Sequence, residues 1–195
     1  ESVLDDMAVD WEAAWDYFTP GWDNTENLPD ALDYMFRRGF TWQTLTEWEI
    51  GYDSISETIS IPYRDVEGLL VGFKGRAWWP DAIPKYRSLG NKEGREDRYT
   101  FNTVPVSQLL FGSWRVQAGR RLIVCEGELN TMAMWQYGHR RVVGISGQFL
   151  SDDQARQILA LAEEVLFLFD EEEKALKAAD KIEHVVPVWV VPERD

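Results

Sequence analysis

Cysteine and histidine are scarce in this chain, which has one cysteine and two histidines among 195 residues. A single cysteine, Cys125, excludes an internal disulfide framework and a cysteine-rich zinc module. No apolar run reaches the roughly 18 residues of a membrane-spanning helix, so no membrane partner is expected. The first residues are acidic and lack the basic and apolar regions of a signal peptide. These absences together predict a cytoplasmic protein.

A glycine-lysine loop of the Walker A type is also absent, which excludes a P-loop helicase within these residues. Basic side chains are in the minority, and the net charge is −14. Residues 1–59 carry 2 basic and 14 acidic side chains, residues 60–121 carry 11 and 6, and residues 122–195 carry 7 and 14. The middle third is therefore a basic island. It has two interpretations, ordinary unevenness of charge or a local phosphate-binding surface.

Two short apolar runs end abruptly at carboxylates. Residues 122–125 precede Glu126-Gly-Glu128, and residues 165–169 precede Asp170-Glu-Glu-Glu173. Both runs are too short for helices and are typical of buried parallel strands, whose carboxyl ends meet at the ligand-binding edge of a sheet. Acids at strand ends are often helix caps or solvated charges. Two such clusters at one edge would repel each other without a cation, and oxygen ligands suit Mg²⁺ or Mn²⁺.

The remaining pattern predicts helices, a hairpin and two further strands. Apolar residues at helical spacing predict a helix over residues 3–18, another over 28–38 and a third capped by Thr41. Alternation over 59–73 predicts a β-hairpin, and residues 84–98 are predicted to form a basic loop. Helices are expected over 131–137, 151–162 and 173–183, with strands over 142–145 and 185–191. Gly147 follows the first of these strands, in a loop where a phosphate can approach the backbone.

The carboxylate motifs resemble those of the TOPRIM domain, which bacterial-type primases share with topoisomerases and some nucleases. The resemblance lies in Glu126-Gly-Glu-Leu-Asn130, Gly144-Ile-Ser-Gly147 and Phe169-Asp170-x-Glu172. Earlier segments resemble the primase RNA-polymerase domain in particular: residues 34–41, 50–52, 61–68, 71–76, 84–86 and 110–112. The implied fold is α/β, an N-terminal mixed α+β subdomain followed by an open, mainly parallel sheet with flanking helices. The expected parts are residues 1–27, 28–118 and 119–195.

The resemblance also assigns roles to individual residues. It makes Glu126, Asp170 and Glu172 catalytic metal ligands, with Asp195 as a further ligand. It gives template or triphosphate binding to Arg38, Arg76, Lys85 and Arg87, although Arg38 could equally serve the C-terminal dipole of its helix. Secondary positions are Glu128, Asn130 and Gly147. Glu172 and Asn130 depart from the family pattern, which has aspartate at both places.

The function implied is metal-dependent synthesis of short RNA primers on single-stranded DNA, a nucleotidyltransferase activity. The expected partners are the DNA template, nucleoside triphosphates and the RNA–DNA hybrid product, and the resemblance also points to a replicative helicase. The two departures keep open a catalytically weak TOPRIM module that only binds nucleic acid. A TOPRIM nuclease is a third hypothesis.

Overall fold

The computed structural model describes residues 28–53, 56–89 and 104–191, which form two compact units. Of the described residues, the first unit comprises 28–53, 56–63 and 70–89, and the second comprises 64–69 and 104–191. The helix predicted over residues 3–18 lies outside the described residues, as does Asp195. The boundary predicted between residues 118 and 119 stays a prediction.

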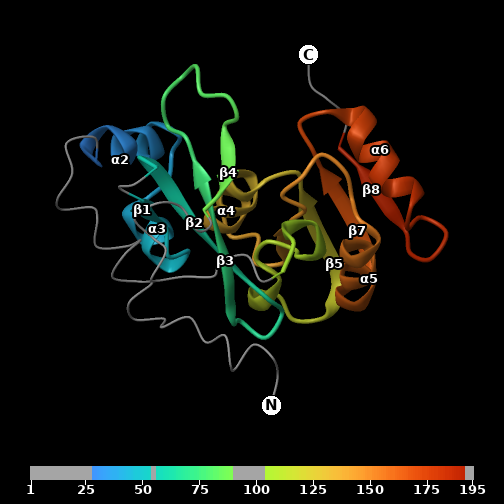
Figure 1. Cartoon of the computed structure of the whole chain (residues 1–195). Helices are drawn as coiled ribbons and strands as arrows, with labels where there is room; N and C mark the ends of the chain where they lie inside the picture. The colour runs from blue at the N-terminus through green and yellow to red at the C-terminus, as the bar shows by residue number, and fades with distance from the viewer. Residues whose placement is uncertain (1–27, 54–55, 90–103, 192–195) are drawn as a thin grey trace. The chain divides into compact units, whose positions relative to one another are not determined.

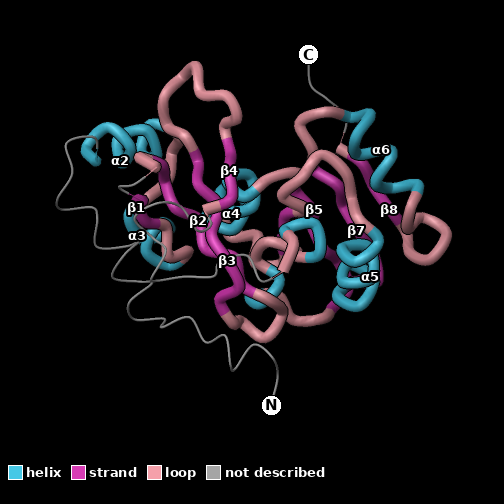
Figure 2. Tube along the Cα trace, viewed as in Figure 1, coloured by secondary structure: helices cyan, strands magenta, loops and turns pink. Residues whose placement is uncertain are grey.

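The first unit contains an antiparallel sheet in the order β1-β2-β3-β4 (Figure 1; Figure 2). Its strands are β1 Gly51–Asp53, β2 Thr58–Arg64, β3 Leu70–Arg76 and β4 Tyr86–Ser88. The predicted hairpin is confirmed as β2 and β3. The prediction of a loop from residue 84 was wrong for Tyr86–Ser88, because these residues pair antiparallel with Lys74–Arg76 of β3.

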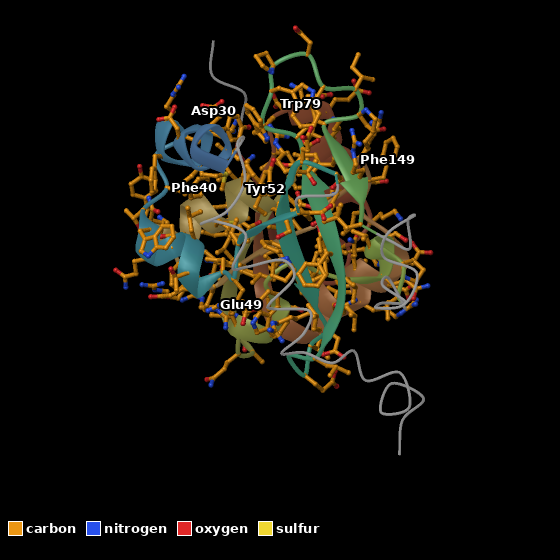
Figure 3. All side chains as sticks on the ribbon, turned by 60° about the vertical axis from the view of Figure 1, so that its left-hand side comes forward. Asp30, Phe40, Glu49, Tyr52, Trp79 and Phe149 are labelled. Carbon is orange, nitrogen blue, oxygen red and sulfur yellow. The ribbon has the colours of Figure 1, made fainter. Side chains whose placement is uncertain are left out.

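Among the described residues, two helices precede this sheet, α2 Leu28–Arg37 and α3 Trp42–Glu47. Helix α2 ends at Arg37, and Gly39 two residues later has a φ of +86°, which is costly for any residue with a Cβ. Thr41 caps α3 as predicted, and its hydroxyl accepts a hydrogen bond from the amide of Thr44 at 3.2 Å. Phe40 and Tyr52, both labelled in Figure 3, belong to the buried core of this unit.

The second unit is built on a parallel sheet in the order β6-β5-β7-β8. Its strands are β5 Gly119–Cys125, β6 Val142–Gly144, β7 Ala162–Leu168 and β8 Val188–Val190. The pairing places Cys125 opposite both Gly144 and Leu168, so the carboxyl ends of three strands reach one edge. The mainly parallel α/β sheet expected from the sequence is confirmed.

Three helices accompany this sheet: α4 Glu128–Gln136, α5 Asp152–Leu161 and α6 Glu172–Asp180. Helix α4 packs on β5 and β6, α5 on β5 and β7, and α6 on β7 and β8. Ser151 and Gln154 form a reciprocal capping box at the start of α5. Two single-turn 3-10 helices, Val106–Gln108 and Ser113–Arg115, precede β5. No helix within the described ranges is long and apolar enough to span a membrane.

Helix α4 begins three residues earlier than predicted. The expected start was at Thr131, a residue type common at helix caps. Instead Gly127 is the extended N-cap, and its carbonyl accepts the amide of Thr131 at 3.1 Å and the hydroxyl of Thr131 at 2.9 Å. Thr131 therefore lies inside the helix, where its hydroxyl donates to the carbonyl four residues earlier. Glu128 and Asn130 consequently lie on the first turn of a helix and not in a loop.

Candidate metal centre and cationic pocket

The acidic residues predicted to bind a metal follow β5 and β7 at the same edge of the parallel sheet. We call this group the carboxylate edge: Glu126 after β5, and Asp170, Glu171 and Glu172 around the start of α6. The two strands end side by side because Val124 pairs with Phe167 and Cys125 with Leu168. The fold therefore brings Glu126 and Asp170 to one edge, as the sequence predicted.

Glu126 is the least exposed acid of the edge, with 19% of its side chain accessible. Its Oε1 accepts a hydrogen bond from the ammonium of Lys174 at 3.0 Å. Its Oε2 is buried and has no hydrogen-bond partner. A buried carboxylate oxygen left without a partner is costly, and a cation beside it removes that cost. This orphan oxygen fits a divalent ion.

Asp170 is exposed, and its carboxylate accepts a hydrogen bond from Asn130. The side-chain amide nitrogen of Asn130 donates to Oδ1 of Asp170 at 3.0 Å. The sequence analysis gave Asn130 a secondary place at the site, where the family pattern has aspartate. In the structure its amide nitrogen faces Asp170, so Asn130 partly satisfies this carboxylate with a neutral donor.

The third predicted ligand within the described residues, Glu172, is exposed in the first turn of α6. Glu128, which the sequence placed among the secondary positions, is buried at the start of α4. Within residues 28–53, 56–89 and 104–191, no three acidic, histidine or cysteine side chains converge closely enough to hold a metal ion. The donor set is chemically suitable for Mg²⁺ or Mn²⁺, but its members need to approach one another to form a complete site.

Lys174 was missed by the sequence reasoning. It lies in the first turn of α6 and also contacts Glu171 at 2.7 Å. Its hydrogen bonds to Glu171 and Glu126 raise the pKa of its ammonium, which therefore stays charged at neutral pH. The available signal was its position four residues after Asp170, on the face of a helix that begins at the carboxylates.

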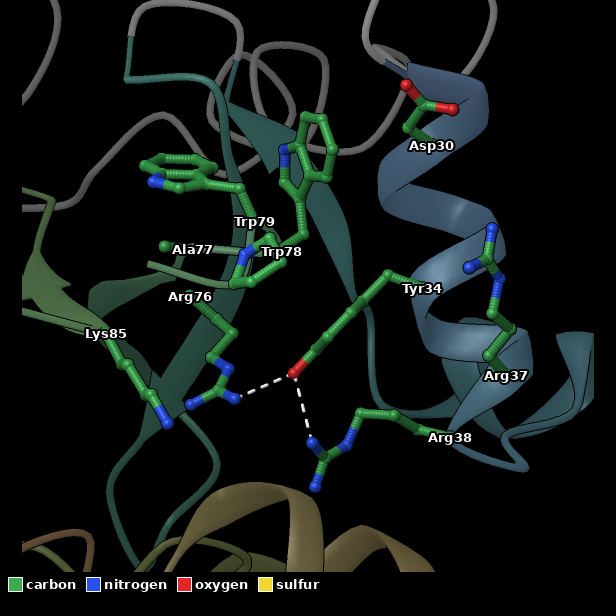
Figure 4. A pocket seen from close by; sticks show the side chains of 10 residues that line it. Asp30, Tyr34, Arg37, Arg38, Arg76, Ala77, Trp78, Trp79 and Lys85 are labelled. Carbon is green, nitrogen blue, oxygen red and sulfur yellow. Dashed lines mark hydrogen bonds between the residues drawn. The ribbon is translucent and has the colours of Figure 1, made fainter. Parts of the chain in front are cut away.

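Three of the four predicted basic residues line one pocket of about 460 Å³ in the first unit, which we call the cationic pocket. Figure 4 shows where they come from: Arg38 follows α2, Arg76 ends β3 and Lys85 precedes β4. Tyr34, Trp78 and Trp79 supply aromatic walls. Arg87 does not line this pocket.

Tyr34 holds the two guanidinium groups in place. Its hydroxyl accepts from Arg76 at 2.7 Å and from Arg38 at 3.1 Å (Figure 4). Arg76 also stacks on Tyr86, with 4.5 Å between the guanidinium carbon and the ring centre. The two tryptophans meet edge to face, and Trp78 donates to the carbonyl of Glu57 at 3.0 Å. The doublet in Arg76-Ala-Trp-Trp-Pro80 was a visible signal for this aromatic wall.

Part of the second unit matches a known protein family. Residues 123–190, which contain the carboxylate edge, match the family described as Toprim-like. A DNA primase of Pseudomonas aeruginosa is 29% identical over 86% of this chain and 25% of its own length. A DNA primase of Campylobacter jejuni is 24% identical over 82% of this chain and 31% of its own length. The chain thus spans about a quarter of the length of the first of these relatives.

Solved structures show the same fold. The Escherichia coli primase catalytic core superposes with a TM-score of 0.75 at 16% identity, over 99% of this chain and 74% of that one. The RNA polymerase domain of Mycobacterium tuberculosis primase gives 0.76 at 18% identity, over 100% and 77%. A DnaG primase catalytic domain described as bound to single-stranded DNA gives 0.70 at 18% identity, over 88% and 63%. Residues 123–190 therefore match the Toprim-like family, and the chain is similar in sequence to bacterial DNA primases and in fold to solved primase catalytic cores.

Proposed function

We propose that this chain is the catalytic core of a DNA primase, which joins nucleoside triphosphates into a short RNA primer on single-stranded DNA. The observation that carries this proposal is the extent of the similarity. Primase relatives align over more than four fifths of the chain, whereas the Toprim-like match covers only residues 123–190. The cationic pocket lies in the part that TOPRIM nucleases and topoisomerases do not share, which favours a primase over those enzymes.

The carboxylate edge supplies the metal-binding half of the proposed chemistry. Glu126, Asp170 and Glu172 are the residues that would hold Mg²⁺ or Mn²⁺. When bound, the ion offsets negative charge on the phosphoryl oxygens and helps to orient the reacting groups. Glu126 is also suited to receive the proton of an attacking hydroxyl, because its Oε2 has no other partner.

The cationic pocket supplies the phosphate-binding half. Guanidinium groups bind phosphate through paired donors, and the double hydrogen bond to Tyr34 fixes Arg38 and Arg76 before a ligand arrives. Such preorganisation reduces the entropy lost on binding. The volume of about 460 Å³ falls in the range of about 300–1,000 Å³ typical of small-molecule sites. A nucleoside triphosphate or a nucleotide of the template is the ligand we propose here.

The experiment is a primer-synthesis assay on single-stranded DNA with four ribonucleoside triphosphates, in Mg²⁺ and in Mn²⁺. We expect short RNA products from the wild type and a loss of at least about a hundredfold in Asp170→Asn, which keeps shape and removes charge. Lys177→Met is the matched control, because Lys177 pairs with Glu173 on the surface of α6. Synthesis at a normal rate by Asp170→Asn would contradict the assigned role of the carboxylate edge.

A nucleic-acid-binding module with little catalysis is the second candidate function. It is favoured by the contacts of Lys174 and Asn130, which occupy Glu126 and Asp170 with donors of the chain itself. Under this alternative the protein binds single-stranded DNA through the cationic pocket and makes no primers in either metal. Binding and synthesis measured on one preparation distinguish the two.

A further inference from the structure

Lys174 lies where a helix disfavours a positive charge. It is in the first turn of α6, which starts at Glu172, and the amino end of a helix carries a partial positive charge. Acidic side chains are the stabilising choice at such a place. An ammonium there needs compensation from outside the helix backbone.

Two carboxylates supply that compensation and enclose the ammonium. Nζ of Lys174 lies 3.0 Å from Oε1 of Glu126 and 2.7 Å from Oε1 of Glu171, and only 21% of the lysine side chain is exposed. Lys177 gives the contrast one turn later. It forms an ordinary surface pair with Glu173, and both side chains are more than half exposed.

The Lys174 ammonium therefore occupies a position beside the carboxylate edge, where the clustered negative charges favour a cation. It satisfies one oxygen of Glu126, and the other oxygen stays buried without a partner. A metal ion that used both oxygens of Glu126 would meet the ammonium at Oε1. The metal ion and the ammonium would then be close together and would repel each other, and their partial burial strengthens this repulsion.

We propose that Lys174 is a resident counter-ion of the carboxylate edge, one that competes with the divalent cation for Glu126. This inference rests on the metal site proposed above. Glu171, which is 60% exposed, also accepts from the ammonium of Lys174. Lys174 can therefore keep this hydrogen bond when a metal ion binds Glu126. Lys174 thus stabilises the metal-free protein and weakens metal binding, so a divalent cation binds only by outcompeting a charge of the chain itself.

The test is the affinity for Mn²⁺ alone, measured from the free-ion signal in electron paramagnetic resonance on the full chain. Lys174→Met keeps the length of the stem and removes the charge, and Lys174→Arg keeps the charge. Lys177→Met removes an equivalent charge from the same helix without touching Glu126. We expect Lys174→Met to bind Mn²⁺ about five- to tenfold more tightly than wild type, and the other two variants to bind within about twofold of it.

A thermal measurement provides a second readout. In chelator, Lys174→Met should melt below wild type, because Glu126 loses its partner, and Mn²⁺ should raise its melting temperature more than that of wild type. Lys174→Gln, which retains a donor, serves in place of Lys174→Met where the latter does not fold. Unchanged or weaker Mn²⁺ binding in these variants, with binding still dependent on Asp170, would overturn the counter-ion role alone. Absence of Mn²⁺ binding in wild type and in every variant would overturn the metal site and this inference together.

Discussion

Asn130 shows how one residue changes the character of the carboxylate edge. An aspartate at this position would face Oδ1 of Asp170 with a second negative charge, whereas the asparagine donates a hydrogen bond at 3.0 Å. A hydrogen bond to a charged acceptor stabilises the folded state, and two facing carboxylates destabilise it unless a cation intervenes. The chain is therefore arranged to tolerate the metal-free state at Asp170 as well as at Glu126.

Asn130→Asp should make the protein more dependent on metal. In chelator we expect the melting temperature to fall by about 2–4 °C, the shift that corresponds to about 1 kcal/mol in a chain of this size. Mn²⁺ should then raise the melting temperature of this variant more than that of wild type, because an added carboxylate strengthens a hard-cation site. Asn130→Ala is the control, since it removes the donor without adding charge. A response to Mn²⁺ no larger in Asn130→Asp than in Asn130→Ala would contradict this account.

Cys125 is a residue whose chemistry is suppressed by its place in the fold. It is fully buried at the end of β5, and burial raises the pKa of its thiol to about 12. In the folded protein the thiol stays protonated, while in the unfolded chain it ionises above about pH 8.5. The unfolded state then holds fewer protons, so this group lowers stability as the pH rises from about 8.5 towards 12.

The corresponding prediction uses the fact that the chain has one cysteine. At pH 8 we compare the reaction of Ellman's reagent with native and with denatured protein over the same time. When the denatured protein has reacted completely, less than about a tenth of the thiol in the native protein should have reacted. In denaturant one equivalent should react. Rapid reaction of the native protein would show that the end of β5 opens, and it would argue against a rigid carboxylate edge.

At the scale of the elements, the contact between β6 and α4 depends on a missing side chain. A Cβ placed on Gly144 would lie 2.6 Å from the hydroxyl oxygen of Thr131 and 3.3 Å from the carbonyl oxygen of Gly127. Thr131 is fully buried and bonds to that same carbonyl at 2.9 Å. The glycine lets the strand approach the beginning of α4, next to the residues that carry the carboxylate edge.

Gly144→Ala should therefore cost about 1–3 kcal/mol of unfolding free energy, as overpacking in a core does. Gly147→Ala is the matched control. A Cβ there would meet only a carbonyl oxygen at 3.8 Å, so we expect a change within about 0.5 kcal/mol. Chemical denaturation of both variants measures the difference, and removing the Thr131 hydroxyl should make the Gly144→Ala cost less than additive. Equal stability of the two alanine variants would show that the contact is not tight.

The elements that sequence reasoning identified are those whose signals are local. The cap at Thr41 and the apolar runs of β5 and β7 act within a few residues, and the structure confirms them. Strand β4 was assigned to a loop, because three residues are too few to show alternation and its pairing with β3 is non-local. The position of α4 depended on a backbone interaction of Gly127 that composition does not display.

In the candidate site, too, the features with local sequence signals were predictable and the non-local contacts were not. Parallel strands made the meeting of Glu126 and Asp170 predictable, since their carboxyl ends share an edge. Lys174 could not be placed, because it reaches Glu126 from a separate element across 48 residues of chain. Tyr34 joins Arg76 across 42 residues in the same way. Long polar side chains choose partners only after the elements have packed, which explains why both contacts were absent from the sequence interpretation.

On the scale of the whole molecule, the net charge is negative although one pocket is positively charged. The net charge is −14, yet Arg38, Arg76 and Lys85 gather in one pocket. Binding of a polyanion depends on the local potential and on the counter-ions that it releases, so an acidic protein can still bind nucleic acid at a basic site. The acidic remainder of the chain should limit such binding to that site.

This distribution predicts the salt dependence of binding to single-stranded DNA. The affinity for a fluorescent oligothymidine should fall as salt rises, and Lys85→Gln should reduce the slope of log K against log salt by about 0.7, the value for one phosphate contact on a single strand. Lys85 is the cleaner position to change, because Arg76 also positions Tyr34 and packs on Tyr86. Lys177→Gln removes the same charge from the second unit and is expected to leave the slope unaltered. Identical slopes for wild type and Lys85→Gln across several salt concentrations would remove Lys85 from the proposed binding surface and return it to the solvent-exposed lysines.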